Sequence, residues 1–178
     1  MPQVSFHTLS IHGVPRSGTS WLGQIFDSHP EVAYRHQPLF AYRLKDRLNL
    51  QSIPGDVSRF LHEVYEVSND EFILDIKRRE PAPEFWQRAV KANRPRYLVV
   101  KMVRYRHLLR LFFENIEDVR IIGIVRNPCA VINSWLQAPK EFRAGWKAHE
   151  ECRYAAKKNP GRRRAVPRGS RTRGNQAL

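Results

Sequence analysis

The order of apolar and polar positions along the chain predicts strands and helices in alternation. Three strands are predicted, over residues 4–12 from the apolar positions Val4, Phe6, Leu9 and Ile11, and over residues 97–103 and 119–125, which have the composition of buried strands. Apolar residues at helical spacing predict helices over residues 19–26, 56–67 (with Asp56 as its N-cap), 85–91 and 108–116, and Asn127-Pro128 opens another. Residues 31–43 are polar and aromatic without a clear period. The alternation indicates an α/β fold, a three-layer sandwich with a central parallel sheet.

The charge of the chain is unevenly distributed. The 178 residues contain 31 Lys and Arg against 17 Asp and Glu, a net charge of +14. Eight of the basic residues fall within residues 157–178, which hold no acid, so the rest of the chain is only moderately basic. From Pro160 onward the composition shifts to Arg, Gly, Ser and Pro, with almost nothing to bury. We therefore expect a folded domain over residues 1–161 and a basic, disordered tail over residues 162–178.

Composition excludes several other classes of protein. A hydrophobic content of 42% is too high for a wholly disordered chain. No apolar run approaches the ~20 residues that a membrane-spanning helix needs, and the N-terminus lacks the pattern of a secretory signal. Two cysteines, Cys129 and Cys152, are too few for a disulfide framework and lack the company of a zinc site. We expect reduced thiols and a cytoplasmic location.

The turn after the first predicted strand has the pattern of a phosphate-binding loop. The spacing of Gly13 and Gly18 matches the nucleotide P-loop G-x-x-x-x-G-K-[ST], so the predicted fold is P-loop NTPase-like. Thr19 stands where that motif has its lysine, and the cation comes earlier in the loop, at Arg16. A strand-to-helix turn presents backbone N–H groups at the positive end of the helix dipole, and the hydroxyls of Thr19 and Ser20 add donors. The pattern favours an anionic ligand.

Two segments carry a resemblance to a known family. The 5′-phosphosulfate loop of the sulfotransferases that use 3′-phosphoadenylyl sulfate (PAPS) is closely similar to Pro15-Arg16-Ser17-Gly18-Thr19-Ser20-Trp21-Leu22. The 3′-phosphate element of the same family, a strand ending in Arg with a Ser eight positions later, is similar to residues 121–135, in which Arg126 and Ser134 take those places. An arginine at the Arg16 position is common in the carbohydrate-type and bacterial branches. The resemblance covers Val4 to about Gly161.

The resemblance implies a PAPS-dependent sulfotransferase that needs no metal. It implies that the 5′-phosphosulfate is bound by the loop residues Arg16, Ser17, Gly18, Thr19, Ser20 and Trp21, and the 3′-phosphate by Arg126 and Ser134. Family members of the carbohydrate type often place a Glu base about twenty residues beyond the loop. Gln37 stands there, so the neighbouring His36, in the polar stretch, becomes the candidate base. Sulfotransferase domains normally continue past Gly161, so the resemblance also implies a domain that is incomplete at its C-terminus.

A third candidate for catalysis comes from the middle strand. Lys101 lies in the apolar run Val99-Val100-Lys101-Met102-Val103, where a charge requires an anionic partner. In a parallel sheet it would lie on the same rim as Arg16 and Arg126, together with Arg104. We therefore expect Arg16, His36 and Lys101 to be catalytic. We expect a small-molecule or carbohydrate acceptor, but the sequence does not identify it: the aromatic residues Tyr34, Phe40, Tyr42 and Trp86 are candidates to line a pocket for a sugar, a lipid or a phenol.

Three other functions remain open on the sequence alone. A P-loop kinase-like phosphotransferase would use the same turn, but the lysine and an obvious magnesium-binding Asp after an apolar strand are missing. A nucleic-acid-binding protein would account for the basic charge, but no nucleic-acid motif is present, so we expect only non-specific binding through the tail. A non-catalytic relic of a sulfotransferase is the third.

Overall fold

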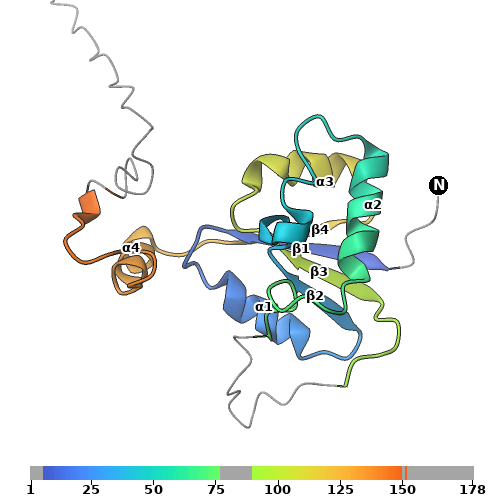
Figure 1. The fold of residues 1–178 in the computed structure, drawn as a ribbon, viewed down its shortest axis with the longest axis horizontal. Coiled ribbons are helices and arrows are strands. Elements are labelled where there is room, and N and C mark those ends of the chain that lie inside the picture. The colour runs from blue at the N-terminus through green and yellow to red at the C-terminus, as the bar shows by residue number, and fades with distance from the viewer. Residues whose placement is uncertain (1–5, 77–89, 150, 152–178) are drawn as a thin grey trace, which may run out of the picture. The chain divides into compact units, whose positions relative to one another are not determined.

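The computed structural model describes residues 6–76, 90–149 and 151. Within these residues four strands form one parallel sheet (Figure 1), whose order is β2-β3-β1-β4. The strands are β1 (His7–Gly13), β2 (Val32–His36), β3 (Tyr97–Lys101) and β4 (Arg120–Ile124). Because the pairs are all parallel, the four carboxyl ends lie along one edge of the sheet. The predicted parallel α/β fold is confirmed.

The helices follow the predicted segments closely. They are α1 (Thr19–Asp27), α2 (Pro54–Tyr65), α3 (Leu109–Asn115) and α4 (Pro128–Leu136), with short 3₁₀ turns η1 (Pro38–Phe40), η2 (Tyr42–Leu44) and η5 (Arg106–Leu108). α2 begins before the expected N-cap: Asp56 lies inside its first turn, where the carboxylate accepts the Ile53 N–H at 3.1 Å. A helix is predicted over residues 85–91. Residues 85–89 lie outside the described part, and the two described residues, 90 and 91, are not helical.

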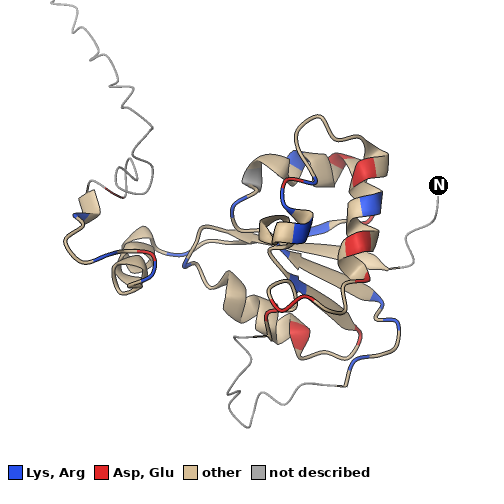
Figure 2. Cartoon of the chain, viewed as in Figure 1, with Lys and Arg blue, Asp and Glu red and all other residues tan. Residues whose placement is uncertain are grey.

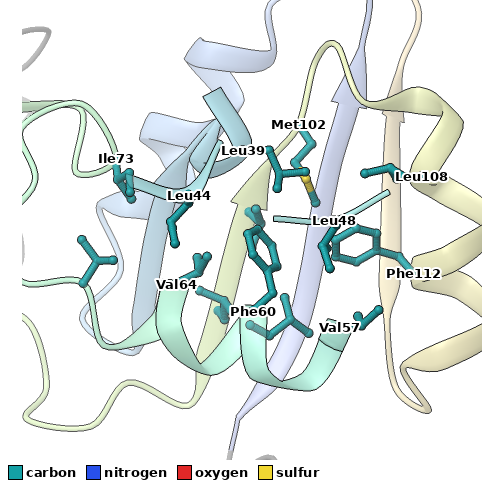
Figure 3. Packing of buried hydrophobic residues seen from close by; sticks show 14 of the residues in the cluster. Leu39, Leu44, Leu48, Val57, Phe60, Val64, Ile73, Met102, Leu108 and Phe112 are labelled. Atoms are coloured by element: carbon teal, nitrogen blue, oxygen red, sulfur yellow. The ribbon is translucent and has the colours of Figure 1, made fainter. Parts of the chain in front are cut away.

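Alternate side chains of the strands pack into two hydrophobic cores, one on each face of the sheet. Leu98 and Val100 of β3 join the larger core with α2 and α3, in which Phe60 and Phe112 are buried (Figure 3). Val99, between them, joins a second cluster on the α1 face. The buried members of that cluster are Ile11, Val32, Tyr34 and Val99, with Leu22 and Phe26 of α1 packed against them. The helices therefore cover both faces, and the three-layer arrangement is confirmed.

Two strands differ from the prediction. β2 was not predicted, because it lies in the stretch over residues 31–43 that has no clear period. β4 forms where a buried strand was predicted, but all five of its residues are exposed or half-buried. Within the described residues β4 pairs only with β1, so it is an edge strand, and the prediction of burial was wrong.

The chain divides into two compact units, residues 1–131 and residues 132–178. The first contains the sheet with α1, α2 and α3. The described part of the second contains a row of aromatic rings, in which Phe142 lies 5.0 Å from Trp135 and 5.9 Å from Trp146. The predicted boundary at residue 161 falls among residues outside the described part. No helix of the described residues is long and apolar enough to cross a membrane.

Candidate functional site

The loop between β1 and α1 leaves the start of α1 open. Gly18 is the N-cap residue, with φ at +104°, a conformation that glycine adopts without strain. No side chain caps the helix, and its first intrahelical bond runs from the Leu22 N–H to the Gly18 carbonyl at 3.1 Å. The backbone N–H groups that come before Leu22 in the first turn therefore have no acceptor inside the helix. The loop therefore presents the positive end of a nine-residue helix to an anion.

Ser17 lies buried at the base of this loop. Its Oγ has no hydrogen-bond partner among the described residues, although the residue is only 6% exposed. A buried hydroxyl left in this state costs about 1–3 kcal/mol. Ser17 fits here because residue 13 is glycine: a Cβ on Gly13 would lie 2.6 Å from Ser17 Oγ and 2.9 Å from Thr19 Cγ2. The hydroxyl supplies a hydrogen-bonding group that the fold itself does not use.

The two segments that resemble the sulfotransferase elements meet in the structure at Arg16. Arg126, just beyond β4, donates from Nη1 to the Arg16 carbonyl oxygen at 2.8 Å. The contact follows from the sheet, since the last pair of the β1–β4 ladder joins Gly13 to Ile124. Both arginines are exposed, and a guanidinium has five N–H donors, so Arg126 retains donors for an anion while it holds the loop.

Lys101 lies on the same edge, at the end of β3. It is 3% exposed, and its Nζ donates to Ser20 Oγ in the first turn of α1 at 2.6 Å. The sequence predicted an anionic partner or contact for this buried charge. The structure adds a second role, because the hydrogen bond joins the sheet to the helix start.

His36 is the last residue of β2 and pairs in register with Lys101. It is buried, not on a surface loop as a lone His in a polar stretch would suggest, because β2 carries it into the sheet. Its Nδ1 lies 3.4 Å from the Tyr34 hydroxyl and 3.5 Å from Asp75 Oδ2, while Nε2 lies 3.2 Å from Gln37 Nε2. Asp75 is a residue that the sequence did not single out.

The remaining candidates lie on several different elements, and one of them, Trp86, lies outside the described residues. Trp21, in the first turn of α1, is 61% exposed. Ser134 lies on α4, in the second unit, and stays a sequence-based prediction as a phosphate ligand. Among the aromatic residues predicted to line the acceptor pocket, Tyr34 is buried against Gly23, whereas Phe40 and Tyr42 are exposed and Trp86 lies outside the described residues. Phe40 carries the Arg104 guanidinium over its ring at 4.9 Å.

The edge formed by the carboxyl ends of the strands is basic. The four segments that leave the strands there, residues 13–26, 36–45, 101–113 and 124–131, contain no Asp or Glu. They contain Arg16, Arg43, Lys45, Lys101, Arg104, Arg106, Arg110 and Arg126. Figure 2 colours acidic residues on α2 and toward the end of α1, and Asp75, beside His36, is an acidic residue that reaches this edge. Segments of one sign around an open helix start raise the local concentration of an anionic ligand.

A parallel α/β sheet with an open helix start, Ser17 and two arginines at its carboxyl edge has the P-loop-like α/β architecture, and the chemistry of that edge suits an anion. The family model described as the Sulfotransferase family matches residues 9–165, and the chain belongs to this family. The match includes both segments whose resemblance the sequence indicated. No curated protein matches the chain closely enough to add to this assignment. Within the described residues, no group of three or more His, Cys, Asp or Glu is arranged to hold a metal ion.

Proposed function

We propose that the protein transfers the sulfuryl group of PAPS to the hydroxyl or amine of a small-molecule or carbohydrate acceptor. The observation that supports the proposal is the hydrogen bond from Arg126 to the Arg16 carbonyl, because it brings together the two segments that resemble the phosphate elements of the family. Membership of the Sulfotransferase family supports sulfuryl transfer in general. The donor PAPS has two anionic ends, a 5′-phosphosulfate and a 3′-phosphate, and the basic edge suits both.

The loop around α1 would hold the 5′-phosphosulfate. Its donors would be the N–H groups at the start of α1, the Ser17 and Thr19 hydroxyls and the Arg16 guanidinium, with Gly18 allowing close approach and Ser20 and Trp21 completing the turn. Arg126 would contact the 3′-phosphate, and Ser134 stays the second candidate for this group on the sequence pattern alone. Charge-assisted hydrogen bonds of this kind contribute about 1.5–3 kcal/mol each.

The transfer itself is an in-line displacement at sulfur. The acceptor oxygen forms a bond to sulfur while the bond from sulfur to the 5′-phosphate oxygen breaks, and the electron pair leaves on that phosphate. The acceptor proton passes to a base, for which His36 is the candidate. Arg16 and the N–H groups at the start of α1 stabilise the negative charge that develops on the departing phosphate. Lys101, which is hydrogen-bonded to Ser20, is a further positive charge at this end of the helix.

The test compares two nucleotides that differ only in the 3′-phosphate. Calorimetry on the full chain should show adenosine 3′,5′-bisphosphate binding about thirtyfold more tightly than adenosine 5′-monophosphate, on the order of 2 kcal/mol. Arg126→Ala should remove most of this preference and leave binding of the monophosphate nearly unchanged. Arg120→Ala is the matched control, because it removes an exposed arginine from the opposite end of the same strand.

Each alternative function predicts a different outcome. Equal affinity for the two nucleotides would overturn the donor assignment, and tighter binding of magnesium-ATP than of the bisphosphate would favour a phosphotransferase. Binding of the bisphosphate without cleavage of PAPS would favour a non-catalytic relic. Salt-sensitive binding of RNA or DNA that disappears when residues 157–178 are deleted would assign the basic tail to non-specific contacts.

A further inference from the structure

The turn over residues 70–76 is built around His36. The Ile73 carbonyl accepts the His36 backbone N–H at 2.7 Å, and the Phe72 ring meets the imidazole edge-on, with centroids 5.4 Å apart. The same turn brings Asp75 Oδ2 to 3.5 Å from His36 Nδ1. Both side chains are buried, the imidazole at 4% and the carboxylate at 8% exposure. One short segment therefore supplies a backbone acceptor, a ring and a carboxylate to a single histidine.

The turn is held by its own hydrogen bonds. Asp70 Oδ1 accepts the N–H groups of Phe72 and Ile73 at 3.0 and 2.8 Å, and the Asp75 N–H donates to the Phe72 carbonyl at 3.1 Å. Asp75 itself has φ at +53°, a conformation that costs a non-glycine residue about 1–2 kcal/mol. The surrounding bonds keep it in this conformation, which places the carboxylate beside the imidazole.

The contacts at the two ring nitrogens favour one tautomer. If Nδ1 carries the proton, it faces the Asp75 carboxylate, and the Nε2 lone pair accepts from the Gln37 amide at 3.2 Å. The reverse tautomer would let Nδ1 accept from the Tyr34 hydroxyl, 3.4 Å away, but it would set the same lone pair against the negative Asp75 oxygen. The separation of 3.5 Å is long for a hydrogen bond, and catalytic hydrogen bonds of this kind often shorten only when the substrate is bound.

We infer that Asp75 is a positioning residue: it holds His36 as the Nδ1–H tautomer, so that Nε2 accepts the proton of the acceptor hydroxyl. The inference rests on the proposed function, and it explains how the candidate base His36 is held in the tautomer that can accept a proton. When the acceptor oxygen bonds to sulfur, its proton moves to Nε2 and the S–O bond to the 5′-phosphate breaks. The imidazolium that forms is paired with Asp75. The acceptor hydroxyl replaces the Gln37 amide at Nε2.

The tautomer can be measured without turnover. Long-range proton–nitrogen NMR of the full chain, labelled with nitrogen-15 in histidine, separates protonated from unprotonated ring nitrogens, and His36→Gln identifies the His36 signals by their loss. We expect Nδ1 protonated and Nε2 unprotonated at about pH 8 in the unmodified chain, above the ordinary histidine pKa. Asp75→Asn should abolish this preference, as the loss of the orienting carboxylate does in serine proteases, and Asp75→Glu should restore part of it.

Asp70→Asn is the matched control, since it makes the same chemical change in the same turn but not at the imidazole. It should leave the tautomer unchanged. With PAPS as donor and water as acceptor, Asp75→Asn should lower kcat at least tenfold at unchanged KM and unchanged affinity for adenosine 3′,5′-bisphosphate. An Nε2–H tautomer in the unmodified chain, or an unchanged tautomer and kcat in Asp75→Asn, overturns the inference. If the unmodified chain does not bind adenosine 3′,5′-bisphosphate, the proposed function is overturned instead. The tautomer of His36 is still measurable in that case, because it does not depend on nucleotide binding.

Discussion

Gly13 offers a direct test of the loop geometry, because it is the point at which the backbone of β1 makes room for Ser17. A methyl group added at residue 13 would lie 2.6 Å from Ser17 Oγ, 2.9 Å from Thr19 Cγ2 and 3.1 Å from the Ile124 carbonyl oxygen. Ordinary contacts begin at 3.4 Å, so at least the Ser17 hydroxyl must move by roughly 0.8 Å. Ser17 and Thr19 are both buried, which leaves them little space.

Overpacking of this kind costs about 1–3 kcal/mol. For a chain of this size each kcal/mol lowers Tm by about 2–4 °C, so Gly13→Ala should lower Tm by about 2–12 °C in a calorimetric scan. The affinity for adenosine 3′,5′-bisphosphate should fall further than stability alone explains, by at least about tenfold at a temperature where the variant is fully folded. The displaced side chains belong to the surface that we propose binds the 5′-phosphosulfate.

Gly123→Ala is the control for this experiment. Gly123 lies on β4 beside His12, and a Cβ there would meet nothing within 4 Å. Tm and nucleotide affinity should therefore stay within error of the unmodified chain. If Gly13→Ala behaves like Gly123→Ala in both measurements, the close packing of Ser17 against Gly13 does not shape the binding loop, and the reasoning fails.

Two further predictions concern a cation and a buried histidine. Arg16→Ala should weaken bisphosphate binding by about 1.5–3 kcal/mol while Arg16→Lys keeps much of it, and unchanged calorimetric affinity in folded Arg16→Ala would remove this side chain from the site. Burial lowers the pKa of His12 below 6.5, so the unfolded chain binds this proton more readily and stability falls as pH drops below about 6.5, by at most ~1.4 kcal/mol per pH unit. The free energy of unfolding in urea should differ less between about pH 7.5 and about pH 5.5 in His12→Asn than in the unmodified chain. An equal difference in the two chains would contradict the attribution of the pH dependence to His12.

Most of the fold could be predicted because local patterns determine most of its elements. β1, β3 and the helices over the described residues lie within a few positions of the predicted ranges. β2 is the exception, and Arg35 is the reason. A charge in a five-residue strand breaks the apolar pattern, yet its guanidinium donates to the carbonyls of Val64 and Tyr65 at 2.8 and 2.6 Å, at the end of α2. These partners lie 29 and 30 residues away, so the sequence around β2 does not indicate them.

The edge position of β4 could not be predicted for a similar reason. Val119–Val125 has the composition of a strand buried on both sides, but burial depends on what lies beside a strand, which the strand's own residues do not encode. Ile121 is 37% exposed in consequence. The contact between Arg126 and Arg16, by contrast, follows from a parallel sheet alone. The carboxyl ends of adjacent strands share an edge, so two motifs 110 residues apart in sequence become neighbours.

The histidine at the end of β2 shows where sequence reasoning stops at the site. His36 was a candidate only because it stands next to Gln37, the residue found in place of an expected Glu, and an amide does not accept a proton usefully. The structure surrounds His36 with the turn over residues 70–76, whose Asp75 has no motif and no spacing to announce it. A carboxylate beside an imidazole makes a base from two residues that are separately ordinary. Substitution of one family residue can thus be compensated by tertiary contacts, and the tautomer of His36 decides whether that has happened here.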